Sequence, residues 1–274
     1  MAEETESGFQ LSGSAPERYE RYVAPIMAPF VEAVVDAVDL FPGATVLDLA
    51  CGTGFAARVA AARVGPAGRV FGADPNDAML KVAEAHHPRM YPDIEFTVAP
   101  ADQLPYADDT FDAVVCQQGA QFLFFPDPNA ALTETARVTR PGGHFAATTW
   151  ASIDKSPYFA AQHRAITEHG GPEAAAGFAA AFSSAERVTA ALRQAGFQDI
   201  VDREVTFGIA LPPLPDYAAN HLSALPWGQT IAETGGQEAL TNAGRMVHTL
   251  LKDHTAPDGT TTLSFTSTLI TATR

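Results

Sequence analysis

The chain has 274 residues, of which 46% are hydrophobic and 18% charged, a balance that predicts a globular α/β protein with a substantial core. Lysine and arginine number 17 against 32 aspartates and glutamates, so the formal net charge of −15 disfavours a nucleic-acid partner. Two cysteines and the lack of an apolar run of membrane-spanning length predict a protein of a reducing compartment, the cytoplasm, without a membrane span.

The first recognisable pattern is a helix. Phe30, Val34 and Val38 recur at helical spacing, and the Phe41-Pro42-Gly43 turn then ends the helix. We assign residues 1–40 to an N-terminal helical cap.

Residues 45–54 read TVLDLACGTG and are followed at once by a helical pattern. The apolar run predicts a buried strand that breaks into a helix N-terminus through a turn carrying Gly52 and Gly54. The two glycines let a ligand approach the backbone, and the first amides of the following helix are unpaired. The stretch therefore predicts a ligand-binding turn.

This turn is compatible with two cofactors. Gly52, Gly54 and Ala57 satisfy the dinucleotide fingerprint, with Asp74 as the acid after the second strand. Asp48, however, places a carboxylate where a pyrophosphate would have to come close. That charge suits S-adenosylmethionine, which carries an ammonium group and a sulfonium, better than NAD.

Four motifs resemble those of the class I S-adenosylmethionine-dependent methyltransferases, especially the ubiquinone/menaquinone-type (type 11) branch of small-molecule methyltransferases. The resemblance extends from about Thr45 to Trp150. It implies a Rossmann-like, doubly wound, mostly parallel seven-stranded sheet with the last strand antiparallel. The motifs are VLDLACGTG (46–54), VFGADPNDAML (70–80), APADQLPYADDTFDAVVCQQG (99–119) and ALTETARVTRPGG (131–143).

Candidate cofactor ligands follow from both arguments. Asp74, at a strand end, can accept two hydrogen bonds from the ribose hydroxyls. The resemblance implies that Asp102 accepts from the adenine amino group, and that an aromatic residue of the cap, Tyr19 or Tyr22, contacts the cofactor. The full predicted set is Tyr22, Asp48, Ala50, Gly52, Gly54, Asp74, Pro75, Met79, Ala101, Asp102, Gln103, Gln117 and Gln118.

Up to Trp150, four strands are expected after the first, at 69–74, 94–98, 111–116 and 144–150. Asn76 and Asp127 are expected to cap the helices that follow them, and Pro141-Gly142-Gly143 to close the second of these helices.

Beyond Trp150 the resemblance fades. A capping box at 183–186 predicts a helix that ends at Gly196, and strands are expected at 200–209 and 262–273. Residues 210–261 form a long insertion between these strands, with helical patterns at 217–224 and 237–252. We predict that it is a substrate lid on one methyltransferase domain, residues 1–274, whose cofactor-binding core is 45–150.

Methyl transfer from a sulfonium needs a catalytic base only when the acceptor must lose a proton. His221, in the lid near Trp227, is the candidate base, although a packing role is open for it. No ligand cluster predicts a metal site.

The predicted acceptor is a small, substantially apolar molecule, because aromatic and aliphatic side chains typically line pockets for such ligands. The candidate lining residues are Phe122, Phe124, Phe125, Leu222, Leu225 and Trp227. Two other functions stay open: a protein that binds S-adenosylmethionine and steers a non-methylating reaction, and a nicotinamide-dependent oxidoreductase. A monomer and a homodimer are both compatible with the sequence.

Overall fold

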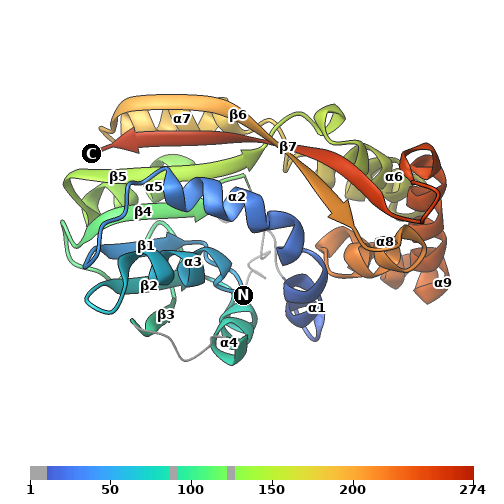
Figure 1. Cartoon of the computed structure of the whole chain (residues 1–274), viewed down its shortest axis with the longest axis horizontal. Helices are drawn as coiled ribbons and strands as arrows, with labels where there is room; N and C mark the ends of the chain where they lie inside the picture. The colour runs from blue at the N-terminus through green and yellow to red at the C-terminus, as the bar shows by residue number, and fades with distance from the viewer. Residues whose placement is uncertain (1–10, 87–91, 122–126) are drawn as a thin grey trace, which may run out of the picture.

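The computed structural model describes residues 11–86, 92–121 and 127–274. Its centre is a seven-stranded sheet in the order β3-β2-β1-β4-β5-β7-β6 (Figure 1). Strand β7 pairs antiparallel with β5 and β6, and the remaining pairs are parallel. The strands are β1 Thr45–Leu49, β2 Arg69–Asp74, β3 Ile94–Val98, β4 Phe111–Gln117, β5 Thr139–Trp150, β6 Gln198–Leu211 and β7 Thr261–Thr273. The fold class expected from the sequence is confirmed.

Helices cover both faces of the sheet (Figure 1). One core contains Val46 of β1 together with the apolar faces of α2 Ala24–Asp36, α3 Phe55–Val64 and α4 Asp77–His86. The other contains Leu47 and Leu49 of the same strand with α5 Pro128–Val138 and α7 Ala185–Gln194. A parallel strand buried on both faces reads as a continuous apolar run, as this one does.

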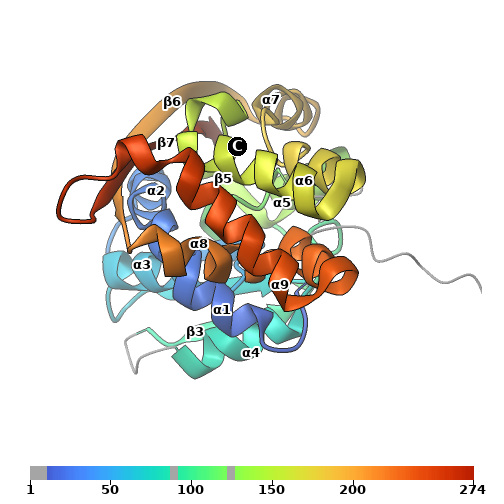
Figure 2. The ribbon, with the colours of Figure 1, turned by 90° about the vertical axis from the view of Figure 1, so that its right-hand side faces the viewer.

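Four helices gather beyond the carboxyl ends of the parallel strands (Figures 1 and 2). They are α1 Ala15–Tyr22, α6 Pro157–Ala179, α8 Leu214–Ser223 and α9 Pro226–Leu250. We call α1 and α2 the cap, and α8 and α9 the lid. Ligands of open α/β sheets bind at this edge, so the cap and the lid cover the expected site. Across the described ranges, no helix is long and apolar enough to cross a membrane.

The first lid helix begins earlier than predicted. Leu214 starts α8, whereas the sequence pattern suggested a start at 217. The difference arises because a proline is tolerated in the first turn of a helix, where its missing N–H has no intrahelical partner. Helix α9 starts at Pro226, but Gly236, with a φ of 70°, divides it into two helical segments that meet at a kink. The second segment matches the helix expected at 237–252, and the first was not predicted.

Two further boundaries are corrections. The capping box at 183–186 is wrong, because Ser183 has a left-handed φ of 57° and α7 starts at Ala185 without a side-chain cap. The segment Pro141-Gly142-Gly143 does not close α5, which ends at Val138. It lies inside β5, since Thr139 already pairs with Phe111 of β4. The two 3-10 turns are η1 Ile153–Lys155 and η2 Lys252–His254.

Close contact between the two lid helices predicts a strong effect of Gly228→Ala. A Cβ at this position would lie 1.8 Å from the carbonyl oxygen of Leu222, so α9 would have to move away from α8. We expect a loss of roughly 1–3 kcal/mol in the free energy of unfolding, measured by denaturant titration. Gly208→Ala is the control, because its Cβ would meet its nearest neighbour at 3.8 Å. Equal stability of the two variants would contradict the packing argument.

Candidate active site

The turn after β1 opens onto a cavity of about 40 Å³ at the carboxyl edge of the sheet. We call this cavity the cradle. Its walls come from the β1–α3 turn, the cap and the end of β4. The lining residues are Tyr19, Ala24, Met27, Asp48, Ala50, Cys51, Gly52, Thr53, Phe55, Ala56 and Gln117.

Gly52 and Gly54 of the turn have different structural roles. A Cβ on Gly52 would lie 3.2 Å from Cε of Met79, so a side chain there would crowd the wall of the cradle. Gly54 caps α3 with a φ of 76°, and a Cβ on it would lie 2.9 Å from the ring of Phe96. Gly54 therefore permits close packing of the turn on β3, while Gly52 keeps the backbone open to a ligand.

Two buried carboxylates lie beneath this turn. Asp48 is 1% exposed, and its Oδ2 accepts from the amide of Ala57 at 2.7 Å. Asp74 is 3% exposed, and its two oxygens accept from the amides of Gly52 and Asn76, each at 2.8 Å. Burial raises the pKa of Asp48 to about 7 and that of Asp74 to about 6. A cation in the cradle would stabilise the ionised form of both groups.

The glutamines at the end of β4 point to different partners. Gln117 lines the cradle, and its Nε2 is buried without a hydrogen-bond partner among the residues that the structure describes, so it can donate to a ligand. Gln118 instead donates from Nε2 to Oγ of Ser267 on β7 at 2.8 Å. This bond turns the Gln118 side chain toward the sheet, and the residue does not line the cradle.

The structure places Tyr19, and not Tyr22, in the cradle wall. Tyr22 is the last residue of α1, and it lines a groove on the outer side of the lid. Of the two tyrosines considered for the cofactor, Tyr19 is therefore the one that lines the cradle, and the predicted contact of Tyr22 with the cofactor stays a prediction.

The remaining predicted residues surround the cradle. Asp102 and Gln103 are exposed on the turn after β3, and Ala101 beside them is buried. Pro75 follows β2, and Met79 of α4 packs behind Gly52. These five residues share the carboxyl edge of the sheet with the cradle but do not line it.

A second cavity, of about 30 Å³, adjoins the cradle at the cap and is lined mainly by aromatic rings. We call it the chamber. It shares Tyr19 and Met27 with the cradle, so these two side chains separate the two cavities. No lining residue carries a formal charge at neutral pH. The lining residues are Tyr19, Val23, Ile26, Met27, Trp150, Phe159, Phe178, Ala181, Phe182, His221, Leu225 and Trp227.

The residues predicted to line an apolar pocket fall in three places. Leu225 and Trp227 lie in the chamber wall, as does His221, the candidate base. Leu222 is fully buried in the core. Phe122, Phe124 and Phe125 lie outside the described residues.

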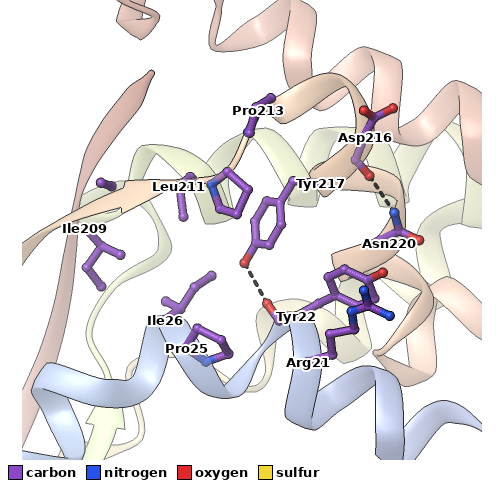
Figure 3. A pocket seen from close by; sticks show the side chains of 12 residues that line it. Arg21, Tyr22, Pro25, Ile26, Ile209, Leu211, Pro213, Asp216, Tyr217 and Asn220 are labelled. Atoms are coloured by element: carbon purple, nitrogen blue, oxygen red, sulfur yellow. Dashed lines mark hydrogen bonds between the residues drawn. The ribbon is translucent and has the colours of Figure 1, made fainter. Parts of the chain in front are cut away.

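An outer groove of about 360 Å³ lies between the cap and the start of the lid (Figure 3). The ring of Tyr217 crosses it, and its hydroxyl donates to the backbone oxygen of Tyr22 at 2.6 Å. Ile26 lines both this groove and the chamber. The sequence analysis did not predict the groove, because its walls are about 190 residues apart in the chain. The proline-rich segment at 211–215, which forms one wall, is the signal that could have indicated it.

Helix α1 is held on two sides. Nη2 of Arg58 on α3 lies 2.7 Å from Oε1 of Glu20, a pair in which both side chains are 17% exposed. The guanidinium of Arg18 donates to the backbone oxygen of Ser223 on α8 at 3.1 and 3.2 Å. The cradle and the chamber each have room for about a water molecule or two. A ligand the size of a nucleoside is larger than either cavity, so it would have to extend beyond the cradle or displace α1 or the lid.

Metal ligands and reactive thiols are two further kinds of group that could carry chemistry. Within the part of the chain that the structure describes, no three His, Cys, Asp or Glu side chains gather to hold a metal ion. Cys51 and Cys116 are buried free thiols, and burial raises the pKa of each, so neither is an activated nucleophile.

Comparison with known proteins gives consistent matches. Residues 47–147 match the family described as a methyltransferase domain. The demethylmenaquinone methyltransferase of Renibacterium salmoninarum is 43% identical over 111 residues, which are 40% of this chain and 43% of that protein. An uncharacterized protein of Mycobacterium tuberculosis is 34% identical over 132 residues, 48% of this chain and 46% of that protein.

Among solved structures, the YcgJ protein of Bacillus subtilis shares the fold, with a TM-score of 0.57 and 17% identity over 90% of this chain and 98% of that chain. The matched segments span about half the length of the curated relatives or less. The matches confirm the resemblance of residues 47–147 to a methyltransferase domain.

The raised pKa of Asp48 predicts a pH effect on the stability of the ligand-free protein. The folded pKa of about 7 lies above the ordinary value of 3.8, so the native state binds more protons between these values than the unfolded state does. The contribution of Asp48 to stability therefore falls as pH rises from about 4 to about 7. In Asp48→Asn, which keeps an oxygen for the Ala57 amide, this contribution is absent.

We expect the difference in unfolding free energy, wild type minus Asp48→Asn, to be lower at pH 8 than at pH 5. Urea titrations of both proteins at the two pH values measure it. A difference that does not change with pH would mean that the Asp48 carboxyl has an ordinary pKa in the native state.

Proposed function

We propose that the protein transfers the methyl group of S-adenosylmethionine to a small, substantially apolar molecule bound in the chamber. The observation that carries the proposal is that the cradle and the chamber share two wall residues, Tyr19 and Met27. A cofactor in the cradle would thus lie next to an acceptor in the chamber, and methyl transfer requires little beyond this juxtaposition.

The cradle residues fit the cofactor. Gly52 leaves the backbone open, the unpartnered Nε2 of Gln117 offers a donor, and Asp48 supplies negative charge. In this proposal Asp74 binds the ribose with the lone pairs that its two backbone hydrogen bonds leave free. When bound, the cofactor supplies an electrophilic methyl group on a positively charged sulfur. Helix α1 covers the cofactor and excludes water from the methyl group. It is held in place by Arg58 on one side and by the carbonyl of Ser223 on the other.

The chamber favours an apolar acceptor. Its rings interlock, with Trp227 edge-on to Phe178 at 4.9 Å and Trp150 edge-on to Phe159 at 4.6 Å between centroids. Because no Lys or Arg lines it, it offers no partner to a phosphate or carboxylate. The Renibacterium relative is named for a menaquinone precursor, and a flat, apolar quinone-type molecule is compatible with such walls.

The proposal includes the domain organisation and the compartment. We propose that cap, core and lid act as one methyltransferase unit. We also propose a cytoplasmic localisation, which the two unpaired cysteines support. The net charge of −15 argues against a nucleic-acid substrate.

The test has two steps. First, release of S-adenosylhomocysteine is measured with a panel of apolar quinols and phenols and with phosphorylated or carboxylated analogues of similar size. We expect turnover with members of the apolar group. Turnover confined to the charged analogues would contradict the proposal, as would cofactor binding without transfer to any apolar member.

Second, the same substitution is made in two buried phenylalanines. Phe178 lines the chamber, and Phe197 is equally buried in the opposite core. We expect Phe178→Leu to raise KM for the acceptor roughly two- to tenfold, the value of one aromatic contact, without changing cofactor affinity. Phe197→Leu should change neither. An effect of equal size in both variants would remove the chamber from the acceptor site.

A further inference from the structure

His221 of α8 is a buried imidazole in an otherwise apolar wall. It is 2% exposed and lines the chamber. Its ring lies edge-on to that of Tyr158 at 5.3 Å and is tilted against that of Tyr217 at 5.6 Å. These contacts fix the plane of the imidazole.

One ring nitrogen of His221 is already engaged. Nδ1 lies 2.8 Å from Nε2 of Gln162 on α6, a buried contact between residues 59 apart in the chain. With the Gln162 amide in this orientation its nitrogen is the donor, and the contact then requires an Nδ1 that accepts and carries no proton. A neutral imidazole then carries its proton on Nε2, the nitrogen that remains for a ligand in the chamber.

The surroundings keep this ring neutral. The ionisable groups packed against it are the phenols of Tyr158 and Tyr217, and Tyr19 lies in the same chamber wall. None of these is charged at neutral pH, because burial raises the pKa of all three. Burial lowers the pKa of His221 to about 3. So weak a base cannot take a proton from a phenol or a carbon acid, whereas a neutral N–H can donate a hydrogen bond.

We propose that Gln162 is a positioning residue that holds His221 in the neutral, Nε2-protonated tautomer, so that His221 donates a hydrogen bond to an oxygen of the acceptor. This proposal rests on the proposed function in taking the chamber as the acceptor site. It replaces the general-base role expected from the sequence. It also narrows the acceptor class to apolar molecules with a hydrogen-bond-accepting oxygen at the reacting end.

Two buried polar atoms in this cluster support a polar ligand group there. Oε1 of Gln162 and the hydroxyl of Tyr158 are buried without a hydrogen-bond partner. Such groups are costly in an apolar interior, and their presence is typical of a functional site.

The tautomer can be measured directly by NMR on the full chain labelled with 15N-histidine. The two ring nitrogens give distinct signals according to which carries the proton, and loss of one set in His221→Gln assigns them. We expect the wild type to show a neutral ring protonated at Nε2, without titration between pH 5 and pH 8. A proton on Nδ1, or a titration in this range, would overturn the proposal.

Substitutions of Gln162 test its positioning role. In Gln162→Glu the carboxylate can only accept, so we expect the proton to move to Nδ1 or the ring to become charged. Gln162→Met has a similar length and no hydrogen bond, so we expect a mixture of tautomers. It also provides a readout if the buried carboxylate prevents folding. A spectrum of His221 unchanged in both variants would show that Gln162 does not set the tautomer.

The role of the donor is tested separately, with an acceptor from the panel. His221→Gln retains an N–H donor and His221→Leu does not, so we expect kcat of the first to exceed that of the second about tenfold, the value of a strong hydrogen bond. Equal loss in both variants would contradict the donor role. Because the tautomer is read without turnover, failure of the proposed function and failure of the Gln162–His221 arrangement give different results.

Discussion

The carboxylate of Asp74 is the contact on which the site depends. By accepting from the amides of Gly52 and Asn76, it joins the turn after β1 to the start of α4 at the end of β2. Asp48 does the same for the first turn of α3 through the amide of Ala57. Burial raises the pKa of both carboxyls, so in the ligand-free fold ionising either of them costs more free energy than it does in water. A positively charged ligand offsets that cost, which is why the cradle suits a cationic cofactor.

The cap turns this cradle into a closed site. Helix α1 is tied to the core through Glu20 and Arg58, and to the lid through Arg18 and Ser223. The hydroxyl of Tyr217 adds a third tie at the end of α1. With Tyr19 and Met27 standing between the two cavities, movement of the cap would open both of them together. In the proposed reaction, coupling of this kind would keep water away from the methyl group.

Sequence patterns predicted those strand limits and helix caps that depend on residues close together in the chain. The limits of β2 and β3 were correct to the residue, because each is an apolar run bounded by turn residues. Asn76 and Asp127 cap α4 and α5 as expected, since a cap is a contact within three residues. The start of β5 was missed because pairing of Thr139 with Phe111 is a tertiary contact, which no local pattern reveals.

The same distinction between local and long-range contacts applies to the site. The structure brings Asp48, Ala50, Gly52 and Gln117, which the motif and its neighbouring strand end had selected, together in the wall of the cradle. Tyr19 and Tyr22 could not be distinguished, because their surroundings depend on where the lid packs. Likewise His221 could be selected as a histidine of the lid, but its partner Gln162 lies on another helix. Its chemical role depends on that contact.

A crystal structure of the protein with S-adenosylmethionine tests the central claim most directly, because it shows where the methyl group points. We expect the ribose to bind to Asp74. We expect the methyl group to point between Tyr19 and Met27, toward the chamber and the imidazole of His221. A methyl group directed into the outer groove or into solvent, or a cofactor bound away from Gly52 and Asp74, would contradict it.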